Sequence, residues 1–358
     1  MDSTANSGRE AARPGPEVLR ARLLAWYDAA ARSLPWRAPP GPGARTDPYF
    51  VWLSEVMLQQ TTVPHATPYF LAFTRRWPRV TDLAAAEDAE VMAAWAGLGY
   101  YARARNLLKC ARAVAERHGG RFPATEAELL ALPGVGPYTA AAVAAIAFDQ
   151  PANVVDGNVE RVMARLFAVE TPLPAGKAEI RARAEAFIIA SAGRHGDWAQ
   201  ALMDLGATVC RPGGPDCAAC PIAAGCAAHA AGTASRYPLK VKKAERPHRH
   251  GVAWVALRDG AVALVRRPDK GLLGGMAALP TSEWRSRAWS RSEMAAAAPA
   301  VADWRLAGSV EHVFTHFSLT LDVYVAAADI PDADWRDAAT AGDGLPSVFL
   351  KALQRGLA

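Results

Sequence analysis

The stretch Leu132–Met163 constrains the fold of this chain more than any other feature. It reads LPGVGPYTAAAVAAIAFDQPANVVDGNVERVM, a glycine turn between two apolar helical runs, followed by Asp156 at the start of a third helix. Apolar runs of this length that lack alternation favour buried helices. We therefore expect a helix–turn–helix unit with one carboxylate placed at a helix mouth.

The turn of this unit is formed by Gly134, Val135 and Gly136. Both glycines permit positive φ and close approach of the backbone, and the helix that follows presents free N–H groups. Such a turn can bind a phosphate through main-chain N–H groups. An ordinary helix–turn–helix corner is the alternative interpretation of the same residues.

Length and composition indicate a multidomain protein with an anionic partner. A chain of 358 residues exceeds what one core usually organises, and 51% hydrophobic residues with 11 Trp predict packed cores. Forty Lys+Arg against 35 Asp+Glu give a formal charge of +5, a moderate bias toward anionic partners. The longest uncharged apolar run, Thr139–Phe148, is too short to span a membrane, and the N-terminus lacks an apolar signal core, so we expect a cytoplasmic location and no membrane partner.

Four of the five cysteines are clustered. Cys210, Cys217, Cys220 and Cys226 are separated by six, two and five residues, which favours a metal site over disulfides in a chain without a secretory signal. Structural zinc sites usually use two close pairs of ligands, and only the middle two cysteines form such a pair. An iron–sulfur cluster tolerates the looser spacing, so we predict a [4Fe–4S] cofactor, with zinc and incidental cysteines as alternatives. Cys110 is interpreted as a small core residue.

The chain before residue 226 is predicted to be all-α. After a lead-in over residues 1–16 that we expect to be disordered, a helix begins near Glu17, and a Pro/Gly loop leads to Asp47-Pro48, a good N-cap and first-turn pair. The next helix is predicted to run to about Gln60. It is apolar almost all round except for a stripe with Glu55 and Gln59, which indicates a buried carboxylate facing a pocket.

The C-terminal part is predicted to be an α+β domain over residues 251–358, preceded by a basic linker over residues 231–250. Two apolar runs flank Asp259-Gly260, which is a strong hairpin signal. Apolar residues alternate with polar ones from His316 to Val325, which predicts a half-buried strand. The overall fold class is therefore mainly α, with a smaller mixed domain at the C-terminal end.

Glu55 and Asp156 are the candidate catalytic carboxylates. Asp156 could merely cap a helix, as could Asn158, and Glu55 could be a satisfied buried acid. One carboxylate in an apolar helix and one at a helix mouth nevertheless match the division of labour in glycosidic bond cleavage. There, one acid donates a proton while the other stabilises an oxocarbenium-like sugar.

Five motifs together resemble the MutY family of adenine DNA glycosylases, within the helix-hairpin-helix base-excision superfamily. The resemblance runs from about Leu34 to Cys226, and the motifs are Trp52–Thr61, Gly97–Tyr101, LPGVGPYTA, Val155–Val159 and the four cysteines. It implies a two-lobed helical glycosylase domain over residues 17–230 with an iron–sulfur loop. Gly271–Gly275 and His312–His316 are similar to the family's C-terminal Nudix-like domain, which implies a module that recognises 8-oxoguanine.

The resemblance also implies roles for individual residues. Glu55 would protonate the adenine and later handle the water, Asp156 would stabilise the positive charge at the sugar carbon, covalently or electrostatically, and Tyr138 and Asn158 would support them. Trp36 and Arg37 would line the adenine pocket, although the loop after them looks lengthened. The residues implied to contact the duplex are Gln60, Thr61, Leu98 and Tyr100 around the lesion, Gly134, Val135 and Gly136 at the phosphate backbone, and Phe314, Thr315 and His316 at the 8-oxoguanine.

The implied function is monofunctional removal of adenine mispaired with 8-oxoguanine, or with lower preference guanine, in double-stranded DNA. We expect a monomer in the cytoplasm, associated with the nucleoid. The main alternative is a bifunctional glycosylase of the endonuclease III type, which carries a Lys for Schiff-base chemistry where this chain has Tyr138. An active Nudix hydrolase is disfavoured because Glu283 and Glu293 do not form the short Glu run that binds Mg²⁺, and a non-enzymatic DNA-binding protein is a further alternative.

Overall fold

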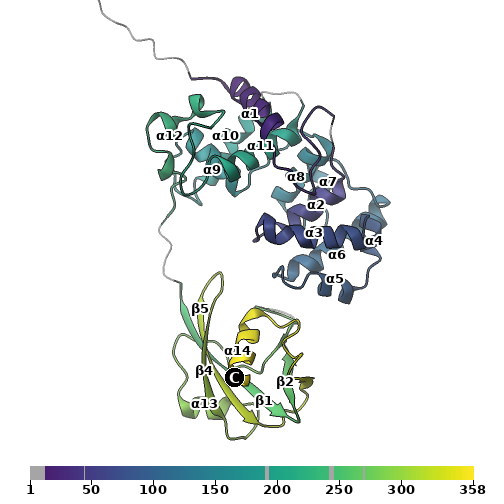
Figure 1. Ribbon diagram of the computed structural model, residues 1–358, viewed down its shortest axis with the longest axis vertical. Coiled ribbons are helices and arrows are strands. Elements are labelled where there is room, and N and C mark those ends of the chain that lie inside the picture. The colour runs from purple at the N-terminus through teal and green to yellow at the C-terminus, as the bar shows by residue number, and fades with distance from the viewer. Residues whose placement is uncertain (1–12, 44, 190–192, 242–245, 269–270) are drawn as a thin grey trace, which may run out of the picture. The chain divides into compact units, whose positions relative to one another are not determined.

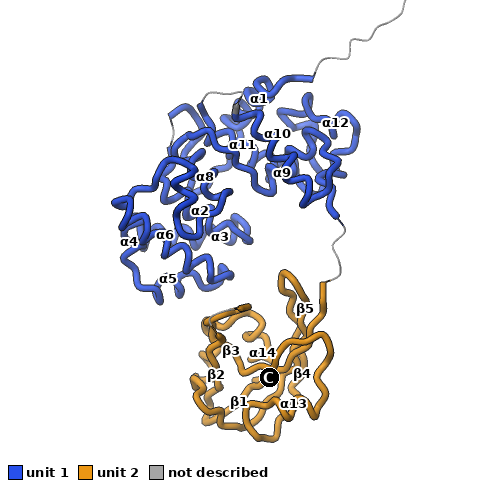
Figure 2. Tube along the Cα trace, turned by 180° about the vertical axis from the view of Figure 1, so that it is seen from behind, with its two compact units in different colours: residues 1–242 blue, residues 243–358 orange. Residues whose placement is uncertain are grey.

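A computed structural model describes residues 13–43, 45–189, 193–241, 246–268 and 271–358. The chain divides into two compact units, Met1–Lys242 and Lys243–Ala358, shown in blue and orange in Figure 2. Of the lead-in predicted over residues 1–16, residues 1–12 lie outside the described residues. Pro16 is already the first residue of helix α1. No helix among the described residues is long and apolar enough to cross a membrane.

The first unit is helical, as predicted. Among its described residues the only pairing of extended backbone is one isolated β-bridge between Leu173 and Lys240. The helices are α1 (Pro16–Ala30), α2 (Pro48–Met57), α3 (Val63–Arg76), α4 (Val80–Ala84), α5 (Asp88–Ala94), α6 (Ala102–His118), α7 (Glu126–Leu130), α8 (Pro137–Phe148), α9 (Gly157–Leu166), α10 (Lys177–Ile189), α11 (His195–Thr208) and α12 (Ala227–Ala230), with short 3₁₀ turns η1 (Ala223–Gly225) and η2 (Ala234–Arg236).

Helix α8 joins two groups of helices, α2–α7 and α1 with α9–α12, which form the two lobes visible in Figure 1. It packs against α2 and α7 on one side and against α11 on the other. Every residue from Thr139 to Ala147 is buried, and most are alanines, whose small side chains let the neighbouring helices approach closely. At Gly196 of α11, an added Cβ would lie 2.7 Å from the main-chain oxygen of Ala145. Helix α8 therefore brings α2 and α11 to opposite sides of one region.

Helix α2 begins as the sequence predicts and ends earlier. The Asp47 side chain accepts a hydrogen bond from the Tyr49 N–H at 2.8 Å, which confirms the predicted N-cap. The helix stops at Met57, and Gln60 has φ of 60°, a left-handed conformation that a helix cannot contain. The prediction that α2 runs to Gln60 is therefore wrong, and Gln59 lies in a turn beyond the helix that carries Glu55.

The second unit is a mixed sheet covered by helices, which confirms the predicted α+β class. Its elements are β1 (His248–Arg258), β2 (Ala261–Arg266), β3 (Ala277–Ala278), α13 (Arg291–Ala297), β4 (Arg305–Val313), β5 (Ser318–Ala327), β6 (Asp334–Asp337) and α14 (Ser347–Leu357). The strand order is β3-β2-β1-β5-β4, with β6 paired to β2, and β1 and β5 run parallel. Val348, Phe349 and Leu353 of α14 belong to the main core of this unit, and Met294 of α13 packs with Val252 and Trp254 of β1 in a separate cluster.

Two local predictions for this unit are confirmed. Leu257 pairs with Val262 and Arg258 with Ala261, which leaves Asp259 and Gly260 as a two-residue turn with φ of 49° and 79°. Along β5 the apolar side chains are buried in alternation with less buried polar ones, as the period of two predicts.

The segment predicted as a linker, residues 231–250, includes packed residues at both ends. Tyr237 is buried in the core of the first unit, and the Val241 N–H donates to the main-chain oxygen of Leu173 at 3.3 Å. Strand β1 already begins at His248. Residues 242–245, where the two units divide, lie outside the described residues.

Candidate active site

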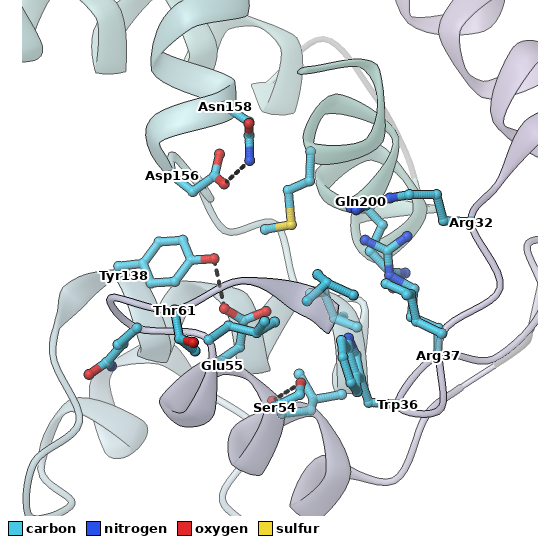
Figure 3. Close-up of a pocket in the computed structure, with 17 residues that line it drawn as sticks. Arg32, Trp36, Arg37, Ser54, Glu55, Thr61, Tyr138, Asp156, Asn158 and Gln200 are labelled. Atoms are coloured by element: carbon cyan, nitrogen blue, oxygen red, sulfur yellow. Dashed lines mark hydrogen bonds between the residues drawn. The ribbon is translucent and has the colours of Figure 1, made fainter. Parts of the chain in front are cut away.

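A cavity of about 270 Å³ lies among α2, α8, α9 and α11 in the first unit. Figure 3 shows that Glu55 of α2, Tyr138 of α8 and Asp156 at the start of α9 point toward this space, with Gln200 of α11 across it. The cavity therefore contains both carboxylates that the sequence singles out, although a hundred residues of chain separate them.

Glu55 is a buried acid held close to its titration point. It is 8% exposed, and burial raises its pKa to about 7, with a further increase from the charge of Asp156. The hydrogen bond from Tyr138 and the charge of Arg37 act in the opposite direction. A carboxyl with a pKa near neutrality can both donate and accept a proton at physiological pH, which is what general acid–base catalysis requires.

Tyr138 holds Glu55 in place. Its hydroxyl donates to Glu55 Oε2 at 2.7 Å, as the dashed line in Figure 3 shows. Burial, and then the neighbouring carboxylates, raise the pKa of Tyr138 well above its usual value, so the hydroxyl stays protonated and remains the donor. The position comes from the first turn of α8, where Pro137 starts the helix immediately after the glycine turn.

Asp156 caps α9 and lines the cavity at the same time. Its Oδ1 accepts the Val159 N–H at 2.7 Å, and its Oδ2 accepts from Asn158 Nδ2 at 2.8 Å. The positive end of the α9 dipole favours a carboxylate at this position. Arg161 Nη2 donates to Asn158 Oδ1 at 2.8 Å, which leaves the Asn158 amide pointing its NH₂ group at Asp156. The capping role and a role in the cavity are thus compatible.

The opposite wall carries cations held by a carboxylate that sequence reasoning missed. Trp36 and Arg37 line the cavity as the resemblance implies, and both are nearly buried. Asp204 of α11 is fully buried and accepts from Arg37 Nη1 at 2.8 and 2.9 Å and from Arg32 Nε at 2.7 Å. Gln200, one turn earlier on α11, lines the same cavity. A lone carboxylate in the apolar run ALMDLG was the available signal, and it is the same kind of signal that identified Glu55.

The glycine turn behaves differently at its two glycines. Gly134 has φ of 73°, and an added Cβ would lie 2.6 Å from Asn106 Cβ, so both its conformation and its surroundings require glycine. Gly136 has φ of −94° and does not use the positive φ that glycine permits. It is the N-cap of α8, and nothing lies within 4 Å of where its Cβ would be. The N-terminus of α8 is therefore open to close approach of a ligand.

The residues that the resemblance assigns to duplex contact fall into two units. In the first unit, Thr61 lines the cavity, Leu98 is 5% exposed and Tyr100 is 56% exposed. In the second unit, Thr315 and His316 are exposed in the turn between β4 and β5.

Beside that turn, the Phe314 ring packs 5.5 Å from Trp284 and 4.8 Å from Phe317, measured between ring centroids. Glu293 in the first turn of α13 accepts the N–H of the N-cap Ser290 and is paired with Arg285 and Arg287, which lower its pKa. The Glu293 carboxylate is therefore occupied by hydrogen bonds and ion pairs within the second unit.

The four clustered cysteines are free thiols of intermediate exposure in the loop after α11. Burial raises the pKa of Cys220 to about 12, with smaller increases from Cys210, Cys226 and Cys217. Arg165 Nη1 lies 3.2 Å from Cys210 Sγ. Within the described part of the chain, no three His, Cys, Asp or Glu side chains are grouped closely enough to hold a metal ion.

Comparison with known proteins identifies the family. Residues 53–187 match the model of the HhH-GPD superfamily of base excision DNA repair proteins, and residues 251–355 match the NUDIX domain. The adenine DNA glycosylase of Mus musculus is 36% identical over 87% of this chain and 71% of its own length. The chain belongs to the adenine DNA glycosylase family.

Other relatives agree with this assignment. The adenine DNA glycosylases of Homo sapiens and Schizosaccharomyces pombe are 35% and 30% identical, over 67% and 83% of their own lengths and 87% and 88% of this chain. Among solved structures, a thermostable thymine-DNA glycosylase is 30% identical with a TM-score of 0.53, and the match covers 60% of this chain and 97% of that one. The family predicted from the motifs is confirmed, and with it an adenine DNA glycosylase of base excision repair that binds DNA.

Proposed function

We propose that the protein uses this cavity to remove adenine mispaired with 8-oxoguanine from duplex DNA, and with lower preference adenine opposite guanine. The observation that carries this proposal is the pairing of Glu55, whose pKa is raised to about 7 by burial, with Asp156, which is held at the mouth of α9 in the same cavity. The pair supplies a proton donor on one side and a carboxylate on the other, as cleavage of a bond between a base and a sugar requires.

The reaction follows from these positions. An adenine flipped out of the stack enters the cavity, and Glu55 transfers its proton to the adenine ring. The bond between the base nitrogen and the sugar carbon then breaks with its electron pair moving to the base. Asp156 stabilises the positive charge left on the sugar, covalently or electrostatically. Water adds to the sugar carbon and gives its proton to Glu55, which restores the starting state. Tyr138 and Asn158 keep the two carboxylates oriented.

Recognition is proposed to use both units. In the first unit, Trp36 and Arg37 contact the adenine, and Gln60, Thr61, Leu98 and Tyr100 contact the opened duplex. The turn at Gly134, Val135 and Gly136 binds a phosphate at the open N-terminus of α8, in agreement with the anion preference of helix N-termini. In the second unit, Phe314, Thr315 and His316 read the 8-oxoguanine. We further propose that the enzyme acts as a monomer in the cytoplasm, near the nucleoid, which size-exclusion chromatography with light scattering would test for oligomeric state.

The enzyme is proposed to release the base without cutting the strand. Strand cutting through a Schiff base needs an amine nucleophile, and the cavity presents the Tyr138 hydroxyl at the position that carries Lys in the bifunctional enzymes. Borohydride treatment during the reaction should therefore trap little covalent protein–DNA adduct. Efficient trapping would favour the endonuclease III type of activity.

The four cysteines are proposed to hold a [4Fe–4S] cluster. Four free thiols in one loop are the donor type that such a cluster requires, and binding would have to draw the four sulfurs together, because the structure does not group them. When bound, the cluster would tie this loop of the first unit together. Broad visible absorbance with matching amounts of iron and sulfide would support the proposal, and a colourless protein with stoichiometric zinc would contradict it.

The proposed function is tested by release of adenine under single-turnover conditions. The substrate is a duplex with one 8-oxoguanine:adenine pair, and the wild-type protein is compared with Glu55→Gln, which keeps the size of the side chain and removes its proton. We expect the variant to lose at least about a hundredfold in rate, as general acid–base groups contribute. Equal rates would refute the role of Glu55.

A further inference from the structure

One arginine outside the cavity joins two segments that are far apart in the sequence. The guanidinium of Arg103, near the start of α6, donates to main-chain oxygens at the end of α2, in the turn that follows α2 and in the loop before α6. The acceptors and their distances are Val56 O at 2.9 Å, Met57 O at 3.2 Å and Gln59 O at 2.6 Å from Nη1, and Leu98 O at 2.9 Å and Gly99 O at 3.2 Å from Nη2.

The two segments each contain a non-glycine residue in a left-handed conformation. Gln60 has φ of 60° and Tyr100 has φ of 50°. Such conformations cost free energy and persist only where the surrounding structure enforces them. Arg103 bonds the main-chain oxygen of the residue immediately before each, Gln59 and Gly99. The contacts of one side chain therefore hold both strained positions.

Arg103 rests on a buried tryptophan, whereas the two left-handed residues beside it are exposed. Trp95 is fully buried, its ring centroid lies 5.2 Å from Arg103 Cζ, and its Nε1 donates to the Gly99 oxygen at 3.0 Å. The oxygens of Val56 and Met57 are among the last of α2, which favours a cation at this end of the helix. Tyr100, in contrast, is 56% exposed, and Gln60 is exposed as well.

We propose that Arg103 is a positioning residue that fixes the Gln59–Thr61 turn and the Leu98–Tyr100 loop in the geometry that opens the duplex. This inference rests on the proposed function, in which the exposed residues of both segments contact DNA. Arginine suits the role because its planar fork reaches oxygens in two directions at once, which a lysine ammonium on a flexible stem does not reproduce.

Duplex opening can be measured apart from chemistry. In a Glu55→Gln background, a 2-aminopurine next to the target adenine reports unstacking in an 8-oxoguanine:adenine duplex at saturating protein. We expect Arg103→Met to lower the ratio of opened to stacked DNA at least about tenfold, because the loss of a single charge-assisted hydrogen bond already corresponds to about that change and the substitution removes every hydrogen bond of the guanidinium. Arg103→Lys should give a smaller decrease of the same sign, and it carries the comparison if the methionine variant does not fold.

Arg112→Met is the matched control. Arg112 lies on the same helix and also donates to main-chain oxygens, those of Ala84 at 3.3 Å and Ala86 at 3.1 Å, neither of which belongs to a residue that lines the cavity. Its loss should leave the 2-aminopurine signal unchanged. The proposal would be overturned if Arg103→Met gave the same 2-aminopurine signal as the Arg112→Met control. If the methionine variant does not fold, the same comparison is made with Arg103→Lys.

A second measurement separates a role in opening from damage to Glu55. With Glu55 restored, Arg103→Met should slow adenine release more from an 8-oxoguanine:adenine pair than from adenine opposite an abasic site, where no base pair has to be broken. Equal slowing on both substrates would mean that the substitution acts on the catalytic residues and would also overturn the proposal. A different result would show that the proposed function itself is wrong. In that case the Glu55→Gln protein would still release adenine.

Discussion

Glu55 should cost the folded protein stability at neutral and alkaline pH. Its pKa in the folded state is raised from the ordinary 4.5 to about 7, chiefly by burial. The folded state therefore binds the proton more tightly than the unfolded state does. The carboxyl contributes its full share of stability below about pH 4.5, and this contribution is lost as the pH rises through about 7. Glu55→Gln removes the titrating group and keeps an oxygen for the Tyr138 hydroxyl.

The size of the effect follows from the shift. A difference of about 2.5 units at 1.36 kcal/mol per unit gives about 3 kcal/mol. Relative to wild type, the Glu55→Gln protein should gain this amount of stability between about pH 4 and pH 8. For a unit of this size, 1 kcal/mol moves the Tm by about 2–4 °C, so the Tm difference should grow by about 6–12 °C.

The assay is thermal unfolding of both full-length proteins in matched buffers across this pH range. The transition of the helical unit is followed, since Glu55 lies within that unit. Every contribution that does not involve Glu55 cancels in the difference between the two proteins. A Tm difference that stays constant from about pH 4 to pH 8 would refute the claim that burial raises the pKa of Glu55.

Three further predictions follow from contacts of the same unit. Tyr138→Phe removes a hydrogen bond that lowers the pKa of Glu55. The alkaline limb of the single-turnover rate should therefore move up by about 1–2 pH units, and an unmoved limb would count against the bond. Asp204→Asn leaves the nearly buried Arg37 and the partly exposed Arg32 without their charge partner and should destabilise the protein by about 3–5 kcal/mol in chemical unfolding, whereas a loss below about 1 kcal/mol would show that the ion pairs are dispensable. Cys220→Ser should lower the iron content and the visible absorbance of the purified protein, and unchanged iron would exclude this thiol as a ligand.

Local signals in the sequence were sufficient for much of the fold. The Asp47 cap, the Asp259-Gly260 turn and the alternation along β5 are each decided by neighbouring residues, and each is confirmed. Glu55 could be singled out for a related reason, because a carboxylate in an otherwise apolar helix has to face a pocket or a partner.

Features that depend on approach in three dimensions could not be predicted in the same way. Helix α2 cannot reach the left-handed Gln60, whose turn Arg103 of a distant helix helps to hold, and no pattern within α2 announces this turn. Asp204 carried the same signal as Glu55, yet its partners on the loop after α1 are visible only once α11 is packed against α1. The close contact that excludes a side chain at Gly134 likewise depends on Asn106 of a distant helix.

The central claim is that Glu55 delivers the proton that releases adenine, and the pH dependence of the single-turnover rate on an 8-oxoguanine:adenine duplex tests it most directly. We expect the wild-type rate to fall on the alkaline side with an apparent pKa at or above about 7, since bound DNA excludes further water from an acid that is already buried. A rate that does not change between about pH 6 and pH 9 would contradict the account.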